Sequence, residues 1–181
     1  MSGQAAAQDA SIARSMQPFS RADDATVASV DATQFITFVI GDDHYGIDIM
    51  AVREIKDWTA IRHLPHQPDY VRGICSLRGA FIPIIDLRCR FGQGLTAATV
   101  MHVVIIVQME QQLVGLLADR VSDIISVDPA KIKPVPKVAQ TARLDFLSGI
   151  VTIDEALIAL IELPNLLTQP EIKVEEAAVV H

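Results

Sequence analysis

Residues 35–49 read FITFVIGDDHYGIDI, and this stretch contains the pattern that decides the fold. Residues 35–40 form an apolar run rich in β-branched and aromatic side chains, which are typical of strands. Residues 41–43, Gly-Asp-Asp, are turn formers, and over residues 45–49 apolar side chains alternate with Gly and Asp. Two short strands joined by such a turn predict a β-hairpin.

Short apolar runs broken by turn residues continue through the rest of the chain. Ile and Val make up 39 of the 181 residues, and β-branched side chains favour sheet over helix. Residues 73–87, GICSLRGAFIPIIDL, read as two strands around an Arg78-Gly79 turn. Pro83 lacks an amide proton, so we expect it at a strand edge or bulge. Residues 49–55 suit one or two helical turns or a bent strand, and the predicted fold class is mostly β.

An internal repeat organises the body of the chain. Gly46 aligns with Gly115 at an offset of 69 residues. At this offset the further matches are Val52 with Val121, Glu54 with Asp123, and Ile55 with Ile124. At an offset of 76 the matches are Gly73 with Gly149, Ile74 with Ile150, Ile85 with Ile161, Asp86 with Glu162, and Leu87 with Leu163. Because the order of these features is retained, the body is predicted to consist of two homologous β units.

The predicted domain organisation follows from this repeat. The body spans about 33–169, with one unit at about 33–94 and the other at about 100–169. A five-stranded sheet of this size has to hide its edges, and closure into a small barrel does so. We therefore predict two tandem five-stranded barrels with a groove between them. Residues 1–32 and 170–181 are poor in core-forming side chains and are predicted to be a flexible N-terminal tail and a C-terminal tail or short helix.

Charge and hydropathy exclude several classes of protein. The net charge is −7, which disfavours nucleic acid and anionic membrane surfaces as partners. The longest apolar run, 100–107, has only the length of a strand, so no membrane-spanning helix or direct membrane insertion is expected. The first residues carry no secretory signal pattern, and the chain is predicted to be cytoplasmic, with Cys75 and Cys89 as free thiols.

No constellation of residues predicts catalysis or a bound cofactor. His63, His66 and Asp69 are three candidate metal ligands within seven residues, but prolines separate them and nothing completes a tetrahedral set by spacing. We interpret them as a polar loop. A metal- or ligand-binding β protein that uses these three residues remains the alternative from another functional class.

Glu54 and Arg78 are charged residues in otherwise apolar or glycine-rich surroundings, VREI and SLRG. An ion pair between them would hold the segment after the first hairpin against the Arg78-Gly79 turn. A role in contacting a partner is equally compatible with this pattern, and the two roles do not exclude each other.

The body as a whole resembles the CheW family of chemotaxis coupling proteins. The resemblance rests on TFVIGDDHYGIDIMAVREI at 37–55, VRGICSLRGAFIPIIDLRCRFG at 71–92, and LVGLLADRVSDIISVD at 113–128. It implies two five-stranded SH3-like barrels, in agreement with the repeat. It also implies a cytoplasmic, non-catalytic adaptor that binds the regulatory domain of a CheA-type histidine kinase and the cytoplasmic tip of chemoreceptors, and that is recruited to membrane-associated receptor arrays.

The family motifs also imply which residues bind these partners. By position in the motifs they are Val52, Glu54, Ile55, Gly73, Arg78, Gly79, Ile124 and Gly149. Ser76 replaces the asparagine that is usual in the turn motif. This departure keeps open the alternative of a CheW-like paralogue that serves a pilus or second-messenger pathway.

Overall fold

The computed structural model describes residues 31–136 and 145–167. The predicted tail at 170–181, and the predicted tail at 1–32 except for its last two residues, lie outside the described residues. The strands are β1 (Thr33–Ile40), β2 (Asp43–Asp48), β3 (Val52–Asp57), β4 (Val71–Leu77), β5 (Ala80–Asp86), β6 (Val103–Met109), β7 (Gln112–Ala118), β8 (Arg120–Val127), β9 (Leu147–Ile153) and β10 (Ala156–Ile161). The short helices are α1 (Leu87–Arg90), α2 (Leu163–Leu167) and the 3₁₀ turns η1 (Ile49–Ala51) and η2 (Pro129–Lys131).

These ten strands form two five-stranded sheets, so the prediction of a mostly β fold with two five-stranded units is confirmed. One sheet has the order β8-β1-β2-β10-β9 and the other has the order β3-β6-β7-β5-β4. Moving every strand of the first order by five positions along the chain gives the second order. The internal repeat therefore relates the two sheets strand by strand.

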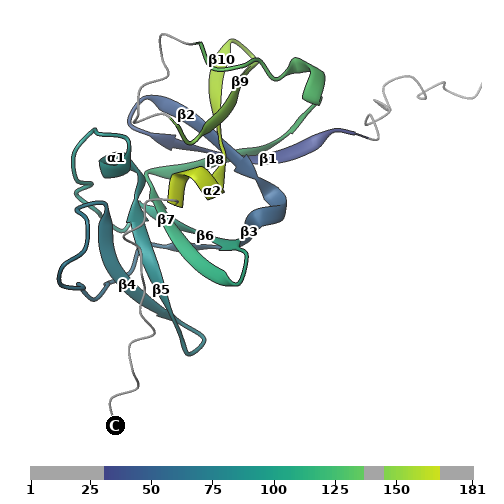
Figure 1. The fold of residues 1–181 in the computed structure, drawn as a ribbon. Helices are drawn as coiled ribbons and strands as arrows, with labels where there is room; N and C mark the ends of the chain where they lie inside the picture. The colour runs from purple at the N-terminus through teal and green to yellow at the C-terminus, as the bar shows by residue number, and fades with distance from the viewer. Residues whose placement is uncertain (1–30, 137–144, 168–181) are drawn as a thin grey trace, which may run out of the picture. The chain divides into compact units, whose positions relative to one another are not determined.

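The predicted units, at about 33–94 and 100–169, need correction. The hairpin β1–β2 belongs to the sheet of β8, β9 and β10, and the hairpin β6–β7 belongs to the sheet of β3, β4 and β5. One sheet is built from a continuous stretch, 52–118, and we call it the inserted barrel. The other combines 33–48 with 120–161, and we call it the flanking barrel. In Figure 1 the purple-blue β1–β2 hairpin accordingly lies among the green and yellow strands β8 to β10. A sequence repeat shows which segments are equivalent, but it does not show which of them pair.

Each barrel is closed by a backbone bridge between its two edge strands. Arg62, beyond the end of β3, pairs with Ile74 in β4, and their reciprocal N–H···O=C bonds measure 2.8 and 2.9 Å. Lys133, beyond the end of β8, pairs in the same way with Ile150 in β9, with two bonds of 2.8 Å. Each bridge thus joins the segment that follows one edge strand to the opposite edge strand, so part of the open sheet edge is paired.

Glycines beside these bridges make the closure possible. A Cβ atom on Gly73, whose φ is +144°, would lie 2.1 Å from the carbonyl oxygen of Arg62. A Cβ atom on Gly149 would lie 2.5 Å from a methyl group of Ile132 and 3.0 Å from the carbonyl oxygen of Lys133. All three distances are shorter than van der Waals contact, so a side chain at either glycine would push the crossing segment away from the barrel.

Three apolar clusters hold the barrels together. The largest draws on both sheets and fills the seam between them, and a smaller cluster fills the interior of each barrel. In the seam, Phe38, Tyr45, Phe91 and Phe146 form a row in which neighbouring ring centroids are 4.6–5.9 Å apart. Burial, reinforced by Asp43, raises the pKa of Tyr45 to about 12, so its hydroxyl group stays neutral in this seam.

Local predictions from the sequence can now be compared with the structure. Residues 35–49 form the expected hairpin, and 49–55 contain the 3₁₀ turn η1 followed by the start of β3. Pro83 lies in β5, an interior strand, and not at a sheet edge; pairing of β5 with β7 begins one residue later, at Ile84. Both cysteines are free thiols, as predicted.

Candidate partner-binding site

The β4–β5 turn and β3 meet on the outside of the inserted barrel. Arg78 and Gly79 have φ values of 51° and 84°, which makes a two-residue turn that suits a tight β-hairpin. The guanidinium of Arg78 lies 3.3 Å from the carboxylate of Glu54 on β3, so the predicted ion pair is present. The side chain of Arg78 is 82% exposed and that of Glu54 is 28% exposed. Barrel closure places these two residues side by side, although β3 and β4 are opposite edges of the sheet.

Large apolar side chains are exposed at matching positions of the two barrels. Ile55 in β3 is 43% exposed and Ile124, its equivalent in β8, is 52% exposed. Phe81 in β5 is 61% exposed and its equivalent 76 residues later, Leu157 in β10, is 59% exposed. Exposure of a large apolar side chain has a free-energy cost, and it recurs here at both pairs of positions. Single exposed apolar side chains are common, but their recurrence at equivalent positions makes these four residues candidates for contact with a protein partner.

Phe81 and Leu157 were missed as candidates from the sequence. Each lies in a strand whose following residues are buried, so the sequence around it resembles a core strand. The available signal was the repeat itself, because both residues stand two positions after the second residue of a hairpin turn. An apolar side chain there points away from the apolar residue that follows it, which is buried in both barrels.

The remaining predicted residues have different surroundings. Val52 is partly buried and packs against the seam cluster at the start of β3. Gly73 and Gly149 lie at the closing bridges, where their missing side chains keep the barrels closed. The eight residues predicted from the motifs are therefore divided between the barrels: Val52, Glu54, Ile55, Gly73, Arg78 and Gly79 belong to the inserted barrel, and Ile124 and Gly149 belong to the flanking barrel.

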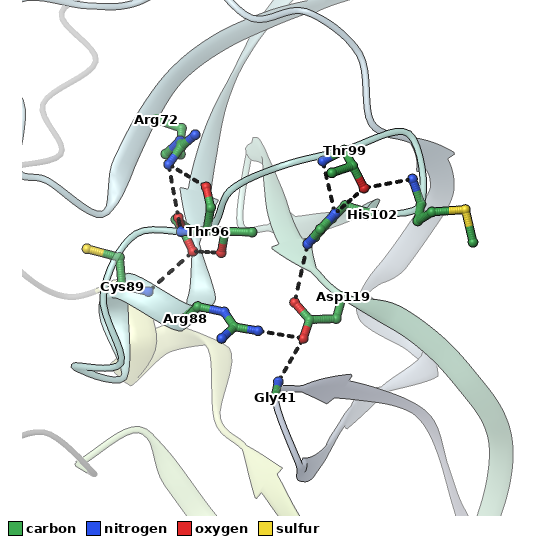
Figure 2. A network of polar contacts seen from close by, with 10 residues as sticks. Gly41, Arg72, Arg88, Cys89, Thr96, Thr99, His102 and Asp119 are labelled. Atoms are coloured by element: carbon green, nitrogen blue, oxygen red, sulfur yellow. Dashed lines mark hydrogen bonds and ion pairs between the residues drawn. The ribbon is translucent and has the colours of Figure 1, made fainter.

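A polar network fixes the flanking barrel to the inserted barrel where the chain passes from β7 to β8 (Figure 2). One carboxylate oxygen of Asp119 accepts hydrogen bonds from the backbone N–H of Gly41 and from the Arg88 guanidinium, each at 2.7 Å. The other lies 3.6 Å from Nε2 of His102. These contacts join the β1–β2 turn, α1 and the segment before β6 on one side of the seam.

The described part of the chain contains no cluster of metal ligands, and its two cysteines are not activated. Among residues 31–136 and 145–167, no group of three or more His, Cys, Asp or Glu side chains could hold a metal ion, so His63, His66 and Asp69 do not form one. Burial raises the pKa of the Cys75 and Cys89 thiols, so neither is an activated thiolate at neutral pH. Within the same residues, no helix is long and apolar enough to cross a membrane.

Two closed barrels that share a core and expose apolar side chains at equivalent positions define a protein-binding module. Comparison with known proteins places this module in a family. The CheW-like domain model matches residues 34–171, and the chain belongs to the CheW family, a family of non-catalytic scaffolds and adaptors.

Individual relatives agree with this assignment. The chain is 43% identical to a probable chemotaxis protein CheW of Rhizobium etli and 41% identical to the chemotaxis protein CheW of Rhizobium meliloti. Each match spans 138 residues, which is 76% of this chain and 89% of the relative. The crystal structure of the scaffolding protein CheW from Thermoanaerobacter tengcongensis superposes with a TM-score of 0.67 at 34% identity, covering 73% of this chain and 85% of that protein.

Proposed function

We propose that this chain is a non-catalytic scaffold that couples chemoreceptors to a CheA-type histidine kinase. The observation that carries the proposal is the recurrence of exposed apolar residues at equivalent positions of the two barrels, in a chain of the CheW family. A scaffold needs at least two binding surfaces, and a duplicated fold supplies them without a second domain.

The receptor side of the proposal concerns the surfaces of β3 and β8. A receptor tip is a helical hairpin, and a helix presents apolar anchors at i, i+3, i+4 and i+7 to an apolar surface. Val52, Ile55 and Ile124 would receive such anchors, because the first is partly buried and the other two are exposed. The Glu54–Arg78 pair beside them would set the orientation of the helix through its charges.

The kinase side concerns the ends of the barrels. The regulatory domain of the kinase has a related fold, so the contact would be between barrel ends, where a few anchors dominate the affinity. Phe81, three residues after Arg78 and 61% exposed, would be a further anchor beside the residues from the motifs. Gly73, Gly79 and Gly149 would contribute by holding the shape of these ends. In the cell, the protein would be cytoplasmic and recruited to receptor arrays at the membrane.

Charge reversal at the turn tests the proposal most directly. We expect Arg78→Glu to lower the amount of kinase that co-sediments with receptor-containing membranes by about tenfold, because the reversed charge faces Glu54 and the partner. Lys131→Glu, at an exposed position in η2, makes the same change in net charge at a residue outside the eight predicted ones and should leave assembly unchanged. Thermal unfolding checks that both variants are folded.

Two results would overturn the proposal or part of it. If wild-type protein is retained neither by receptor membranes nor by the kinase, and the kinase does not respond to receptor, the coupling role is wrong. If folded Arg78→Glu assembles like wild type, Arg78 leaves the set of binding residues. Phe81→Ser, measured in the same assay, then decides whether the barrel end takes part at all.

A further inference from the structure

The inserted barrel is open beyond its closing bridge. β4 is an edge strand, and the reciprocal bonds between Ile74 and Arg62 join it to the segment after β3. In an antiparallel pair, every second residue of a strand directs its N–H and C=O groups to the same neighbour. Ser76 therefore directs these groups to the same side as Ile74, where its partner in this register would be Ala60. No backbone hydrogen bond joins Ser76 to Ala60 in the described part of the chain.

A hollow with a volume of about 430 Å³ lies at this gap. It is lined by residues from both of the segments that stop pairing, together with one residue of β5: Thr59, Ala60, Arg62, Cys75, Ser76 and Phe81. Ser76 and Phe81 are opposite each other in the β4–β5 pair, so their side chains lie on the same face of the sheet. Both residues are exposed, and the phenyl ring therefore offers an apolar surface beside the open edge of β4.

The flanking barrel treats the equivalent segment differently. At its closing bridge Lys133 takes the place of Arg62, so Lys131 takes the place of Ala60. Lys131 ends the turn η2, and its N–H donates to the carbonyl oxygen of Asp128 at 2.8 Å. In the inserted barrel, residues 59–61 belong to no helix or strand, and within the described residues their backbone N–H groups have no backbone acceptor. The inserted barrel thus leaves open a donor that the flanking barrel uses in a turn.

The surroundings of the hollow are positively charged. Arg62 is in its wall, and neither Asp nor Glu is among the residues that line it. Lys56 on β3 is close enough to act on Cys75: burial raises the pKa of this thiol, and the charge of Lys56 opposes part of that rise. The carboxylate of Glu54, on the same face of β3 as Lys56, is already paired with Arg78 at 3.3 Å. A carboxylate on an occupant of the hollow would therefore be attracted to it.

The open backbone groups specify the conformation of such an occupant. A free strand edge is a template for another strand, because an extended segment presents N–H and C=O groups with matching spacing. A helix has already used these groups within itself. Side chains at positions i and i+2 of an added strand lie on one face. On that face the barrel offers Phe81 opposite Ser76, and Arg62 opposite Ile74, two residues away along β4.

We propose that this hollow binds an extended segment of another protein that carries an apolar residue and an acidic residue two positions apart. The main chain of the segment pairs with the open N–H and C=O groups of Ser76. Its apolar side chain packs on Phe81, and its carboxylate pairs with Arg62. Phe81 also belongs to the kinase side of the proposed function, but peptides test this site without kinase or receptor, so failure of one proposal does not decide the other.

Selection from a displayed library of random hexapeptides tests the proposal on the full chain. Peptides are retained that bind the wild-type protein and that bind Arg62→Glu at least about tenfold more weakly, as a carboxylate facing a reversed charge should. We expect the retained peptides to share an apolar residue two positions from Asp or Glu. If no peptide is retained, or if the retained peptides share no such pair, the proposal is wrong.

The flanking barrel supplies matched control variants. Lys133 is equivalent to Arg62 and is also exposed, and Leu157 is equivalent to Phe81. For a retained peptide, Phe81→Ser should raise the dissociation constant about fivefold, while Lys133→Glu and Leu157→Ser should change it less than about twofold. Weakening by the flanking-barrel variants that equals the effect of Phe81→Ser would contradict binding at this hollow.

Amide hydrogen exchange measures the main-chain contact directly. When the peptide saturates the protein, exchange at Ser76 should slow about tenfold or more, whereas exchange at Thr152, the equivalent residue of β9, should not change. Unchanged exchange at Ser76 would overturn strand addition. Slow exchange at Ser76 in the protein without peptide would show that a second copy or another part of this chain already pairs with it, and this result would overturn the proposal as well.

Discussion

The two barrels have the same strand order but opposite charge at their exposed ends. In the inserted barrel the β4–β5 turn is Arg78-Gly79, and its arginine pairs with Glu54. In the flanking barrel the equivalent β9–β10 turn is Asp154-Glu155, also at positive φ, with two acidic side chains. The duplicated fold has therefore kept its backbone geometry and apolar anchors while its charges diverged. Two equivalent surfaces of opposite charge can select different partners, since like charges that face each other penalise the wrong one.

The residues equivalent to the ion pair show the same divergence. Asp123, the counterpart of Glu54, accepts a hydrogen bond from the N–H of Ile124 at 2.7 Å. The backbone N–H of Asp123 meets the hydroxyl of Thr37, on the neighbouring β1, at 3.1 Å. Glu54 thus pairs with a turn arginine in the inserted barrel, whereas Asp123 accepts a hydrogen bond from its own strand in the flanking barrel.

The largest expected effect concerns the closing bridges. Gly73→Ala should lower the free energy of unfolding by about 3 kcal/mol and Gly149→Ala by about 2 kcal/mol, measured by urea denaturation. The two expected losses differ because the added Cβ meets different atoms. At Gly73, whose φ is +144°, it would lie 2.1 Å from a backbone carbonyl oxygen, whereas at Gly149 the nearest atom is a side-chain methyl at 2.5 Å. A side chain can move aside more easily than a backbone bridge.

Gly79→Ala is the control for this pair. Its φ is +84° and nothing lies within 4 Å of the added Cβ, so only backbone strain of about 1 kcal/mol remains. Equal losses for all three variants would show that strain alone, and not closure of the barrels, determines the cost.

A smaller difference is expected between the two equivalent glycines at the centres of β2 and β7. A Cβ on Gly115 would lie 2.5 Å from Ile84 and 2.8 Å from Val104, whereas a Cβ on Gly46 comes no nearer than 3.0 Å to Leu160. We expect Gly115→Ala to cost about 2 kcal/mol and Gly46→Ala less than about 1 kcal/mol in urea denaturation. A larger cost for Gly46→Ala would mean that the interior of the inserted barrel is the more adaptable of the two.

The smallest effect should come from the ion pair itself. A double-mutant cycle of Glu54→Ala and Arg78→Ala should give a coupling of about 0.5 kcal/mol in the free energy of unfolding, because the arginine is 82% exposed and screened by water. The same cycle measured for partner binding should give a larger coupling if the pair is buried on assembly. A coupling above about 2 kcal/mol in the free protein would assign the pair mainly to the fold.

Much of the fold could be predicted from the sequence because the decisive signals are local. The hairpin at 35–49, the turn at Arg78-Gly79 and the order of the repeat all depend on spacing and turn chemistry. The exchange of hairpins between barrels could not be predicted in this way, because apolar alternation shows which side chains are buried but not which strand lies beside them. For the same reason the sequence did not predict that Pro83 lies in an interior strand.

The candidate site was predicted in part, for a related reason. Glu54 and Arg78 stand out as charges in apolar or glycine-rich stretches, and the ion pair that the structure contains was one of the two roles that this pattern left open. Phe81 did not stand out, because an exposed phenylalanine and a buried one look alike in a sequence rich in apolar residues. Gly73 could be identified as a sensitive position, but the carbonyl oxygen that requires a glycine there comes from a segment eleven residues earlier.

The inserted barrel lies between the two segments of the flanking barrel in the sequence, and this order has a consequence for synthesis on the ribosome. All strands of the inserted barrel have been made once Ala118 has been added, whereas the flanking barrel needs Ile161. The β1–β2 hairpin is therefore made first, yet it must wait for β8, β9 and β10 before its own sheet exists. During this interval the hairpin has no partner strands on either side, so its apolar face is open to aggregation or to a chaperone until β8, β9 and β10 are made.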